Sequence, residues 1–280
     1  MKQRVVVTGT SGFIGSLLVK KLVPDFGVVT LQNVLTDTET AEKIIREGDI
    51  LIHLACSTFP AISEQNRARD AEVNIVGTVK LLEVCKRKEV GKIVFLSSGG
   101  TVYGNGAKSH KETDALSPKS SYGVIKATLE SYIQICGLRQ TILRPSNIYG
   151  RRNIGENQML GAVDIFLHRI MNEEPIRIWG DGNNVRDYLY VDDLLDFIAL
   201  SLQDQVEGVY NVGTGIGTSL NQIVRTIEEM SGKKANVEYL PARETDVRSN
   251  ILDASKAKQI GWVAKYSLEK GVQDMLRRFF

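Results

Sequence analysis

The sequence is poor in the residues that build metal centres and disulfide frameworks. It has three cysteines and three histidines in 280 residues. The number of cysteines is odd, and Cys56, Cys85 and Cys136 lie far apart in apolar stretches of the sequence. The histidines do not cluster either. We therefore expect three reduced core cysteines, no metal site and a cytosolic protein.

Long apolar runs and an excess of one charge are also missing. The longest apolar runs have the length of buried strands, far short of the ~20 residues that span a bilayer. The formal net charge is +2, which gives no reason to expect a nucleic acid or an anionic membrane as a partner. Because the first four residues lead directly into a strand pattern, we expect no signal peptide and a cytoplasmic location.

The first half of the sequence instead alternates short β-branched runs with helical patterns. The predicted strands are residues 5–7, 28–31, 49–55, 92–97 and 140–143. The predicted helices are residues 13–22, 38–46 with Thr38 as a candidate N-cap, 68–88 and 118–136. This order predicts an α/β fold with a doubly wound parallel sheet of the Rossmann type.

The pattern changes after Pro145, where glycine and asparagine become frequent. We expect helices at 161–171, from Asp192 or Asp193 to 202, and at 220–231, with strands at 209–212 and 237–240. Residues 1–145 are then a nucleotide-binding domain. Residues 146–280 form a smaller C-terminal α/β substrate lobe, from which residues 185–212 or so return to the first domain.

A glycine-rich loop with the spacing G-x-x-G-x-x-G follows the first strand and opens the first helix. Glycine lets the backbone turn sharply and approach a pyrophosphate, and the helix N-terminus offers N–H groups and a favourable dipole. The loop predicts a dinucleotide site formed by Gly9, Ser11, Gly12, Phe13, Ile14 and Gly15.

The acidic residue that usually binds the adenosine ribose is absent. The second strand ends in Gln32 and Asn33, whose amides can still hydrogen-bond a 2′-hydroxyl. The nearest following basic residue, Lys43, is too distant in sequence to favour a 2′-phosphate. We therefore favour NAD, with NADP left open. Residues 28–53 hold one strand and one helix, which predicts an abbreviated adenosine pocket.

Tyr122 and Lys126 lie near the start of a predicted helix, and their i, i+4 spacing places both on one face. A nearby ammonium and a cationic nicotinamide would lower the pKa of the phenol from its usual ~10. Tyr122 could then exchange a proton with a sugar hydroxyl while hydride moves to or from the cofactor. The alternative is a packed tyrosine beside a solvated lysine.

These features resemble the extended short-chain dehydrogenase/reductase family, in its branch of NAD-dependent nucleotide-sugar epimerases and dehydratases related to UDP-glucose 4-epimerase. The resemblance covers nearly the whole chain. Its motifs are the glycine loop, ILIHLAC, NIVGTVKLLE, SSGGTVYG, YGVIK, ILRPSNIYG, VRDYLYVDD and RETDVRSNILDASKAKQIGW.

The resemblance implies roles for further residues. Asn74 would brace the active-site backbone, and Lys126 would also hold the nicotinamide ribose. The other implied cofactor contacts are Leu54, Ala55, Cys56, Ser97 and Pro145, while His53 is expected to be a buried core residue. Asn147, Arg186 and Arg243 would bind the phosphates of a nucleotide-diphosphate sugar, and Asp246 its ribose. Trp179 would either line the nucleotide pocket or belong to the core.

The turn before Val102 discriminates between reactions in this family. Dehydratases carry acidic residues there, whereas this chain has Gly99, Gly100 and Thr101. We therefore favour 4-epimerisation of a nucleotide sugar, with an NAD(P)H-dependent 4-ketoreductase as the alternative. A non-catalytic dinucleotide-binding relative is disfavoured, since both Tyr122 and Lys126 are present.

The family's usual catalytic Ser or Thr falls on Gly99. We expect Thr101 to supply the hydroxyl that faces the sugar, with Ser98 as the alternative, and the glycines to widen the substrate pocket. The family also implies a homodimer, in which helices 68–88 and 118–136 form a four-helix bundle across a two-fold axis.

Overall fold

The computed structural model describes residues 2–58, 63–104, 109–150, 161–242 and 248–280. These residues divide into two compact units. One consists of residues 1–103, 115–144 and 195–210, and the other of residues 104–114, 145–194 and 211–280. The chain crosses between the units several times, so neither unit is a single continuous segment.

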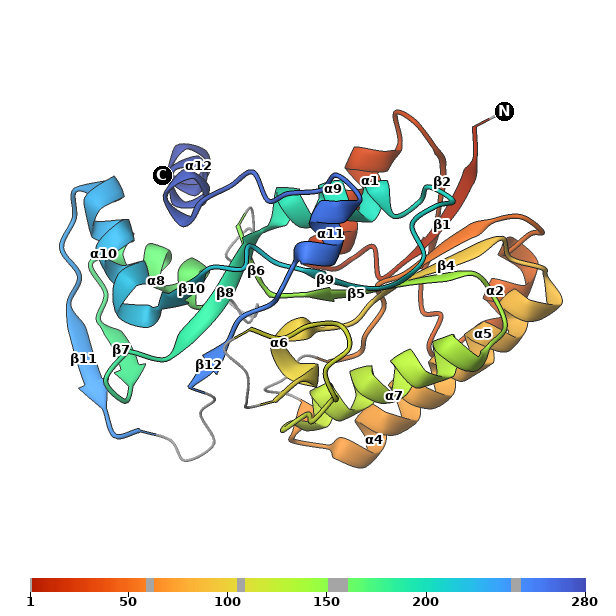
Figure 1. Cartoon of the computed structure of the whole chain (residues 1–280), viewed down its shortest axis with the longest axis horizontal. Coiled ribbons are helices and arrows are strands. Elements are labelled where there is room, and N and C mark those ends of the chain that lie inside the picture. The colour runs from red at the N-terminus through yellow and green to blue at the C-terminus, as the bar shows by residue number, and fades with distance from the viewer. Residues whose placement is uncertain (1, 59–62, 105–108, 151–160, 243–247) are drawn as a thin grey trace. The chain divides into compact units, whose positions relative to one another are not determined.

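The first unit is built on a six-stranded sheet with the order β2-β1-β3-β4-β5-β9 (Figure 1). Its strands are β1 (Arg4–Thr8), β2 (Gly27–Leu31), β3 (Ile50–His53), β4 (Lys92–Leu96), β5 (Gln140–Pro145) and β9 (Gly208–Val212). The pairs from β2 through β5 are parallel. The parallel, doubly wound sheet expected from the sequence is therefore confirmed.

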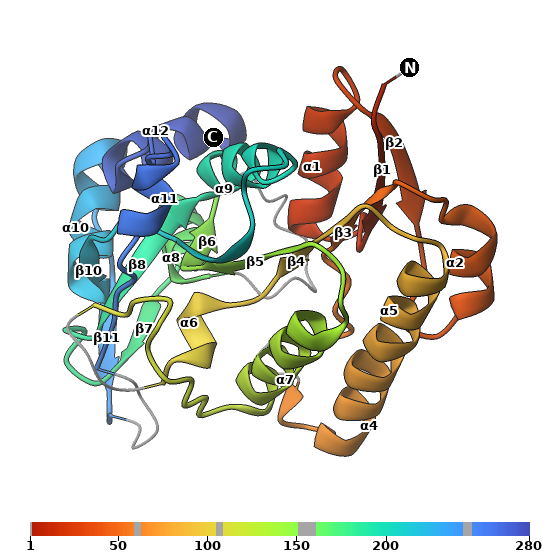
Figure 2. The same ribbon diagram turned by 45° about the vertical axis from the view of Figure 1, so that its right-hand side comes forward.

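Helices cover both faces of this sheet, as Figure 2 shows. They are α1 (Phe13–Leu22), α2 (Thr38–Ile44), α4 (Arg67–Ala71), α5 (Gly77–Arg87), α6 (Gly99–Val102), α7 (Ser121–Ile135) and α9 (Val191–Leu200). One face packs α2, α5 and α7 against the strands through apolar residues such as Leu81, Phe95 and Leu129. On the other face α1 and α9 are joined by an ion pair of 2.6 Å between Lys21 and Asp196.

The second unit contains shorter strands and five helices among its described residues. One of its sheets consists of β6 (Asn147–Tyr149), β8 (Val185–Tyr190), β10 (Gly217–Ser219) and β12 (Ser249–Asn250). The strand order of this sheet is β10-β8-β12, and β6 also pairs with β8. A separate pair joins β7 (Ile176–Trp179) to β11 (Val237–Leu240). The remaining elements are α8 (Ala162–Met171), α10 (Leu220–Ser231), α11 (Ser255–Gln259) and α12 (Leu268–Phe279), besides the start of α9.

Several helix boundaries differ from the expected ones for identifiable reasons. Helix α2 is capped by Asp37, not Thr38, because the Asp37 carboxylate accepts the N–H of Thr40. Helix α7 begins at Ser121, since the hydroxyl of Ser120 accepts the N–H of Gly123. Helix α9 begins at Val191, before Asp192, and ends at Leu200.

The long helix predicted at 68–88 is interrupted. A π-helical segment, Glu72–Val76, separates α4 from α5. Such segments occur as single turns within longer helices and are frequent at functional sites. Gly77 follows it, and a Cβ there would lie 2.3 Å from the Leu35 carbonyl oxygen, so only glycine permits the close approach of α5 to that backbone.

The three cysteines are free thiols, but only Cys85 is buried. Cys56 and Cys136 are half-buried, so the expectation of three core cysteines is correct for one of them. In the described part of the chain, no helix combines the length and apolar character needed to cross a membrane.

Candidate functional site

The glycine loop lies at the topological switch point of the sheet, where the order of the strands reverses. From β1 the chain first builds outward to β2 and then returns to β3 on the other side of β1. In open parallel sheets this switch point, at the carboxyl ends of the strands, is where ligands bind. Gly9 occupies it with a φ of +70°, and a Cβ there would lie 2.7 Å from the backbone nitrogen of Ala55.

The loop leads into α1 through Gly12, which is the N-cap residue and makes no side-chain capping hydrogen bond. Gly15 faces back toward the loop, where a Cβ would lie 2.2 Å from the Gly9 carbonyl oxygen. Only glycine at position 15 therefore allows the loop and the helix to approach this closely. Ser11 and Gly12 stay exposed at the start of the helix, where a phosphate can bind.

The end of β2 contacts this loop directly. The Gln32 amide donates a hydrogen bond to the Thr10 hydroxyl. Asn33 adopts a left-handed conformation with a φ of 53°, and its carbonyl accepts the N–H groups of Thr36 and Asp37. Both amide residues are exposed at the edge of the loop, where the sequence predicted an adenosine contact.

A buried threonine fixes the segment that leaves β3. The Thr8 hydroxyl accepts the N–H groups of Leu54 and Ala55 at 3.2 and 3.1 Å. It also hydrogen-bonds His53, whose other ring nitrogen lies 3.0 Å from the Thr78 hydroxyl. Burial lowers the pKa of His53 to about 3, so it is a neutral core residue as expected.

Asn74 belongs to the π-helical segment and is 1 % exposed. Its side-chain oxygen accepts the N–H of Ser57 at 2.8 Å, and its amide nitrogen donates to Ser57 and to Asp70. Asn74 thus braces the backbone that continues Leu54–Cys56, in agreement with the role implied by the family. Asp70, which sequence reasoning missed, also accepts hydrogen bonds from the hydroxyls of Thr58 and Ser63.

Tyr122 and Lys126 lie one turn apart on α7 as predicted. Lys126 is 3 % exposed, and its Nζ donates to the Leu96 carbonyl, the last residue of β4, at 2.8 Å. The same nitrogen lies 5.6 Å from the centroid of the Tyr122 ring and 4.9 Å from that of Phe95. The solvated-lysine alternative is therefore wrong.

The pKa of Tyr122 is raised above its ordinary value, first by burial and then by the nearby Cys56 and Asp70. The lowered pKa of Tyr122 expected from the sequence is thus not a property of the chain alone, because burial, Cys56 and Asp70 all raise this pKa. A phenolate at neutral pH requires a further positive charge, such as that of an oxidised nicotinamide.

The segment after β4 forms a short helix, α6, instead of the turn that the sequence predicted. Its N–H groups at Thr101 and Val102 both bond the Ser98 carbonyl, at 3.1 Å each. Ser98 and Thr101 are half-buried. A Cβ at Gly123 would lie 2.6 Å from the Thr101 carbonyl oxygen, so glycine beside Tyr122 lets α6 and α7 meet. The candidate hydroxyls and the phenol are carried by elements in contact.

Ser97 and Pro145 occupy the ends of neighbouring strands. Ser97 follows β4, is 3 % exposed and donates its hydroxyl to Glu130. Its side chain therefore points into the protein, which leaves only its backbone for the cofactor contact that the family implies. Pro145 is the buried last residue of β5.

The described residues predicted to bind the phosphates of the substrate, Asn147 and Arg186, lie in the second unit. The Asn147 amide, on β6, donates to the Asp187 carbonyl at 3.0 Å, beside Arg186 on β8. The buried Asp187 carboxylate accepts the N–H groups of Thr214 and Gly215, which fixes the neighbouring loop. Sequence reasoning missed Asp187, although its position next to Arg186 is a usable signal.

The other residues predicted to bind the substrate are Trp179, Arg243 and Asp246. Trp179 lies on β7, in the separate two-stranded sheet, and is 40 % exposed, so the core alternative for it is wrong. Arg243 and Asp246 lie outside the described residues. Among the described residues of this set, the structure places Asn147 and Arg186 on paired strands.

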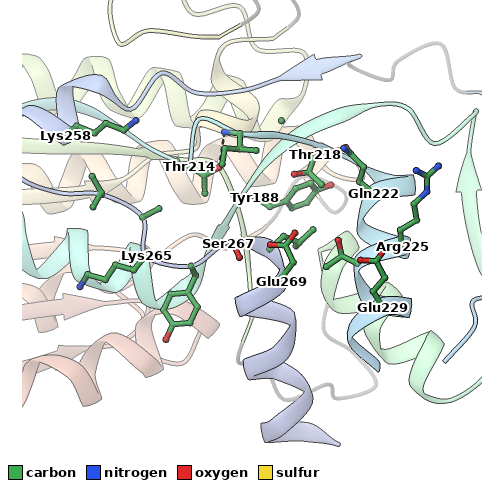
Figure 3. Close-up of a pocket in the computed structure, with 18 residues that line it drawn as sticks. Tyr188, Thr214, Thr218, Gln222, Arg225, Glu229, Lys258, Lys265, Ser267 and Glu269 are labelled. Atoms are coloured by element: carbon green, nitrogen blue, oxygen red, sulfur yellow. Dashed lines mark hydrogen bonds between the residues drawn. The ribbon is translucent and has the colours of Figure 1, made fainter. Parts of the chain in front are cut away.

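The second unit also contains a cavity of about 620 Å³ that the sequence did not predict (Figure 3). Gln222, Arg225 and Glu229 line it from α10, and Ser267 and Glu269 line it from the start of α12. Tyr188 is its one lining residue from β8, and none of the predicted substrate residues that the structure describes contributes to it.

Among the residues that the structure describes, no group of His, Cys, Asp or Glu is arranged to hold a metal ion. The first unit instead combines a glycine-cradled strand–helix turn with a tyrosine and a lysine at the carboxyl edge of a parallel sheet. These features define a Rossmann-type protein built for dinucleotide chemistry.

The chain belongs to the NAD dependent epimerase/dehydratase family, whose model matches residues 5–213. Among solved structures it is similar to the UDP-glucose 4-epimerase of Thermotoga maritima, solved with UDP-glucose. That similarity has 36% identity and a TM-score of 0.92, and covers 99% of this chain and 98% of that one.

Two relatives extend the comparison. The UDP-glucose 4-epimerase of Mycolicibacterium smegmatis is 32% identical over an alignment 308 residues long. This alignment covers 99% of this chain and 98% of the relative. The dTDP-4-dehydro-6-deoxyglucose reductase of Escherichia coli is 30% identical over an alignment 308 residues long. This alignment covers 99% of this chain and 97% of the relative. The family expected from the motifs is thus confirmed.

Proposed function

We propose that the protein catalyses the NAD-dependent 4-epimerisation of a nucleotide-diphosphate sugar through a transient 4-keto sugar. The observation that carries the proposal is the Tyr122–Lys126 pair on α7, held against the end of β4 and next to the hydroxyls of α6. The similarity to UDP-glucose 4-epimerases supports the choice of reaction.

NAD fits the first unit because the glycine cradle between β1 and α1 has no room for any Cβ at Gly9 or Gly15. The exposed backbone at Ser11 and Gly12 would bind its pyrophosphate. Gln32 and Asn33 would contact the adenosine ribose, and the segment Leu54–Cys56 would lie along the cofactor. Bound NAD supplies the acceptor and donor of hydride at C4 of the sugar.

Tyr122 is the acid and base of this reaction. As a phenolate it accepts the proton of the 4-hydroxyl while hydride leaves C4, and it returns that proton once the keto sugar has presented its other face. Lys126, anchored on the Leu96 carbonyl, places a positive charge near the phenol and binds the nicotinamide ribose. Arg186 and Asn147 would bind the diphosphate of the substrate.

Glycine at positions 99 and 100 argues against 4,6-dehydration, since a dehydratase needs an acidic group there to move protons at C5 and C6. One alternative remains supported, a 4-ketoreductase, because the similar Escherichia coli protein is a reductase. The two differ in their use of cofactor. An epimerase retains NAD through purification and turns over without added cofactor, whereas stoichiometric consumption of NADPH would contradict the proposal.

Thr101 and Ser98 compete for the role of the hydroxyl that hydrogen-bonds the reacting sugar oxygen. We expect Thr101→Val, which keeps the shape of the side chain, to lower kcat by about 10²- to 10³-fold, as the loss of one donor to the transition state does. Ser98→Ala is the matched control and is expected to keep most of the activity. Full activity in Thr101→Val together with loss in Ser98→Ala would reverse the assignment.

The outer face of α7 supports the proposal of a homodimer. Val124, Tyr132 and Ile135 are 49, 40 and 77 % exposed, and their spacing places them on one side of the helix. A second copy of the chain would bury this apolar stripe in a four-helix bundle.

We expect Ile135→Glu to convert the dimer into a monomer, measured by light scattering, because a charge would be buried at the interface. Val23→Glu, at a similarly exposed position that ends α1, is the control and should remain dimeric. A monomeric wild-type protein would contradict the dimer.

A further inference from the structure

A buried ion pair with two hydroxyl partners lies behind the catalytic residues of the first unit. Arg144 donates from Nε and Nη2 to both carboxylate oxygens of Glu130, at 2.6–3.1 Å. The Ser97 hydroxyl donates to the same carboxylate, and Arg144 Nη1 donates to the Tyr103 hydroxyl at 2.8 Å. All four residues are at most 4 % exposed.

The guanidinium of Arg144 stays charged in this environment. Burial opposes the charge of Arg144, but the hydrogen bonds and the charge of Glu130 outweigh it, so the pKa of the guanidinium is raised. A buried ion pair is weak evidence for stability, because apolar residues of similar volume can replace one without loss. We therefore look for its role in geometry, and its hydrogen-bond partners indicate which geometry it sets.

The four residues connect the two elements that carry the candidate reacting groups. Glu130 follows Lys126 by four positions and Tyr122 by eight, so all three share one face of α7. Ser97 and Tyr103 stand immediately before and after the segment 98–102 that carries the hydroxyls of Ser98 and Thr101. The two residues that flank segment 98–102 are thus each hydrogen-bonded to the same ion pair.

We propose that Glu130 and Arg144 are positioning residues, which fix the distance between the hydroxyls of α6 and the phenol of Tyr122. The proposal rests on the proposed function for its kinetic consequence. α6 is a single helical turn without a side-chain cap, and the Ser117 N–H also holds it by donating to the Val102 carbonyl at 3.0 Å. Small displacements of a reacting group lower kcat steeply, whereas substrate affinity depends on other contacts.

The test removes the two connections and leaves the ion pair intact, which avoids an unpaired buried charge. We expect Ser97→Ala combined with Tyr103→Phe to lower kcat about 10- to 100-fold, with KM and the affinity for NAD nearly unchanged. Hydrogen exchange of the amides of α6 should become faster, while exchange in α5 should stay the same.

Tyr190→Phe is the matched control. It removes the hydroxyl of another buried tyrosine, which donates to Asp274 in the second unit, and it should lower thermal stability without changing kcat. Unchanged kcat in the double variant, or unchanged exchange of α6, would overturn the proposal. If the wild-type protein converts no nucleotide sugar, the proposed function fails, and the exchange measurement alone decides whether the ion pair restrains α6.

Discussion

Tyr122→Phe is expected to lower kcat by about 10²- to 10⁴-fold, the usual contribution of a positioned acid and base. Phenylalanine keeps the ring and its packing and removes only the group that exchanges the proton. NAD and the nucleotide sugar should therefore bind nearly as well as in the wild type. Steady-state kinetics together with equilibrium binding of both ligands separates the two effects, and turnover at the wild-type rate would disprove the role of Tyr122.

The pH dependence of this residue gives a second readout. In the chain alone, burial raises the pKa of Tyr122, so the phenol is protonated at neutral pH and can act only as an acid. The positive charge of NAD⁺ favours the phenolate and lowers this pKa. The tyrosinate absorbance that is lost in Tyr122→Phe should therefore appear at lower pH with NAD⁺ bound than without it. An equal or higher pH with NAD⁺ would contradict the account.

Gly15→Ala is expected to abolish the retention of NAD. The new Cβ would lie 2.2 Å from the Gly9 carbonyl oxygen and 2.8 Å from the Thr10 Cα, and both are backbone atoms that cannot turn aside. The loop must move, which separates the phosphate-binding N–H groups from the end of β3. The measurement is the amount of nicotinamide released by denaturing the purified variant.

Gly27→Ala provides the control for this substitution. Gly27 begins β2 in the same sheet, and a Cβ there would meet nothing closer than 3.7 Å. It should retain NAD and fold like the wild type. Retention of NAD by Gly15→Ala at the wild-type level would show that the cradle does not bind the cofactor in the proposed way.

Local patterns in the sequence predict the central sheet well, and also the positions of the candidate catalytic residues on their helix. The helices Phe13–Leu22 and Leu220–Ser231 match their expected limits, because a preceding glycine or a capping box defines the start of each. Tyr122 and Lys126 lie on one face of the helix because residues four positions apart in a helix always share a face.

Contacts between distant segments could not be predicted in the same way. The pKa of Tyr122 depends on burial and on Cys56 and Asp70, which precede it by more than fifty positions. The π-helical segment around Asn74 has no periodic signal. Glu130 continues the spacing of Tyr122 and Lys126 by one further turn, but its partner Arg144 is recognisable only from the folded chain.

The most direct test of the central claim uses a nucleotide sugar labelled with deuterium at C4. Purified protein is incubated with such UDP-glucose, and then with the UDP-N-acetylhexosamine and dTDP-, GDP- and CDP-hexose equivalents, without added cofactor. NMR follows the products. The account predicts a C4-inverted product that retains its deuterium at C4, because the hydride removed from that carbon returns to it. Inversion with loss of the label, or turnover only with added NADPH, would contradict the account.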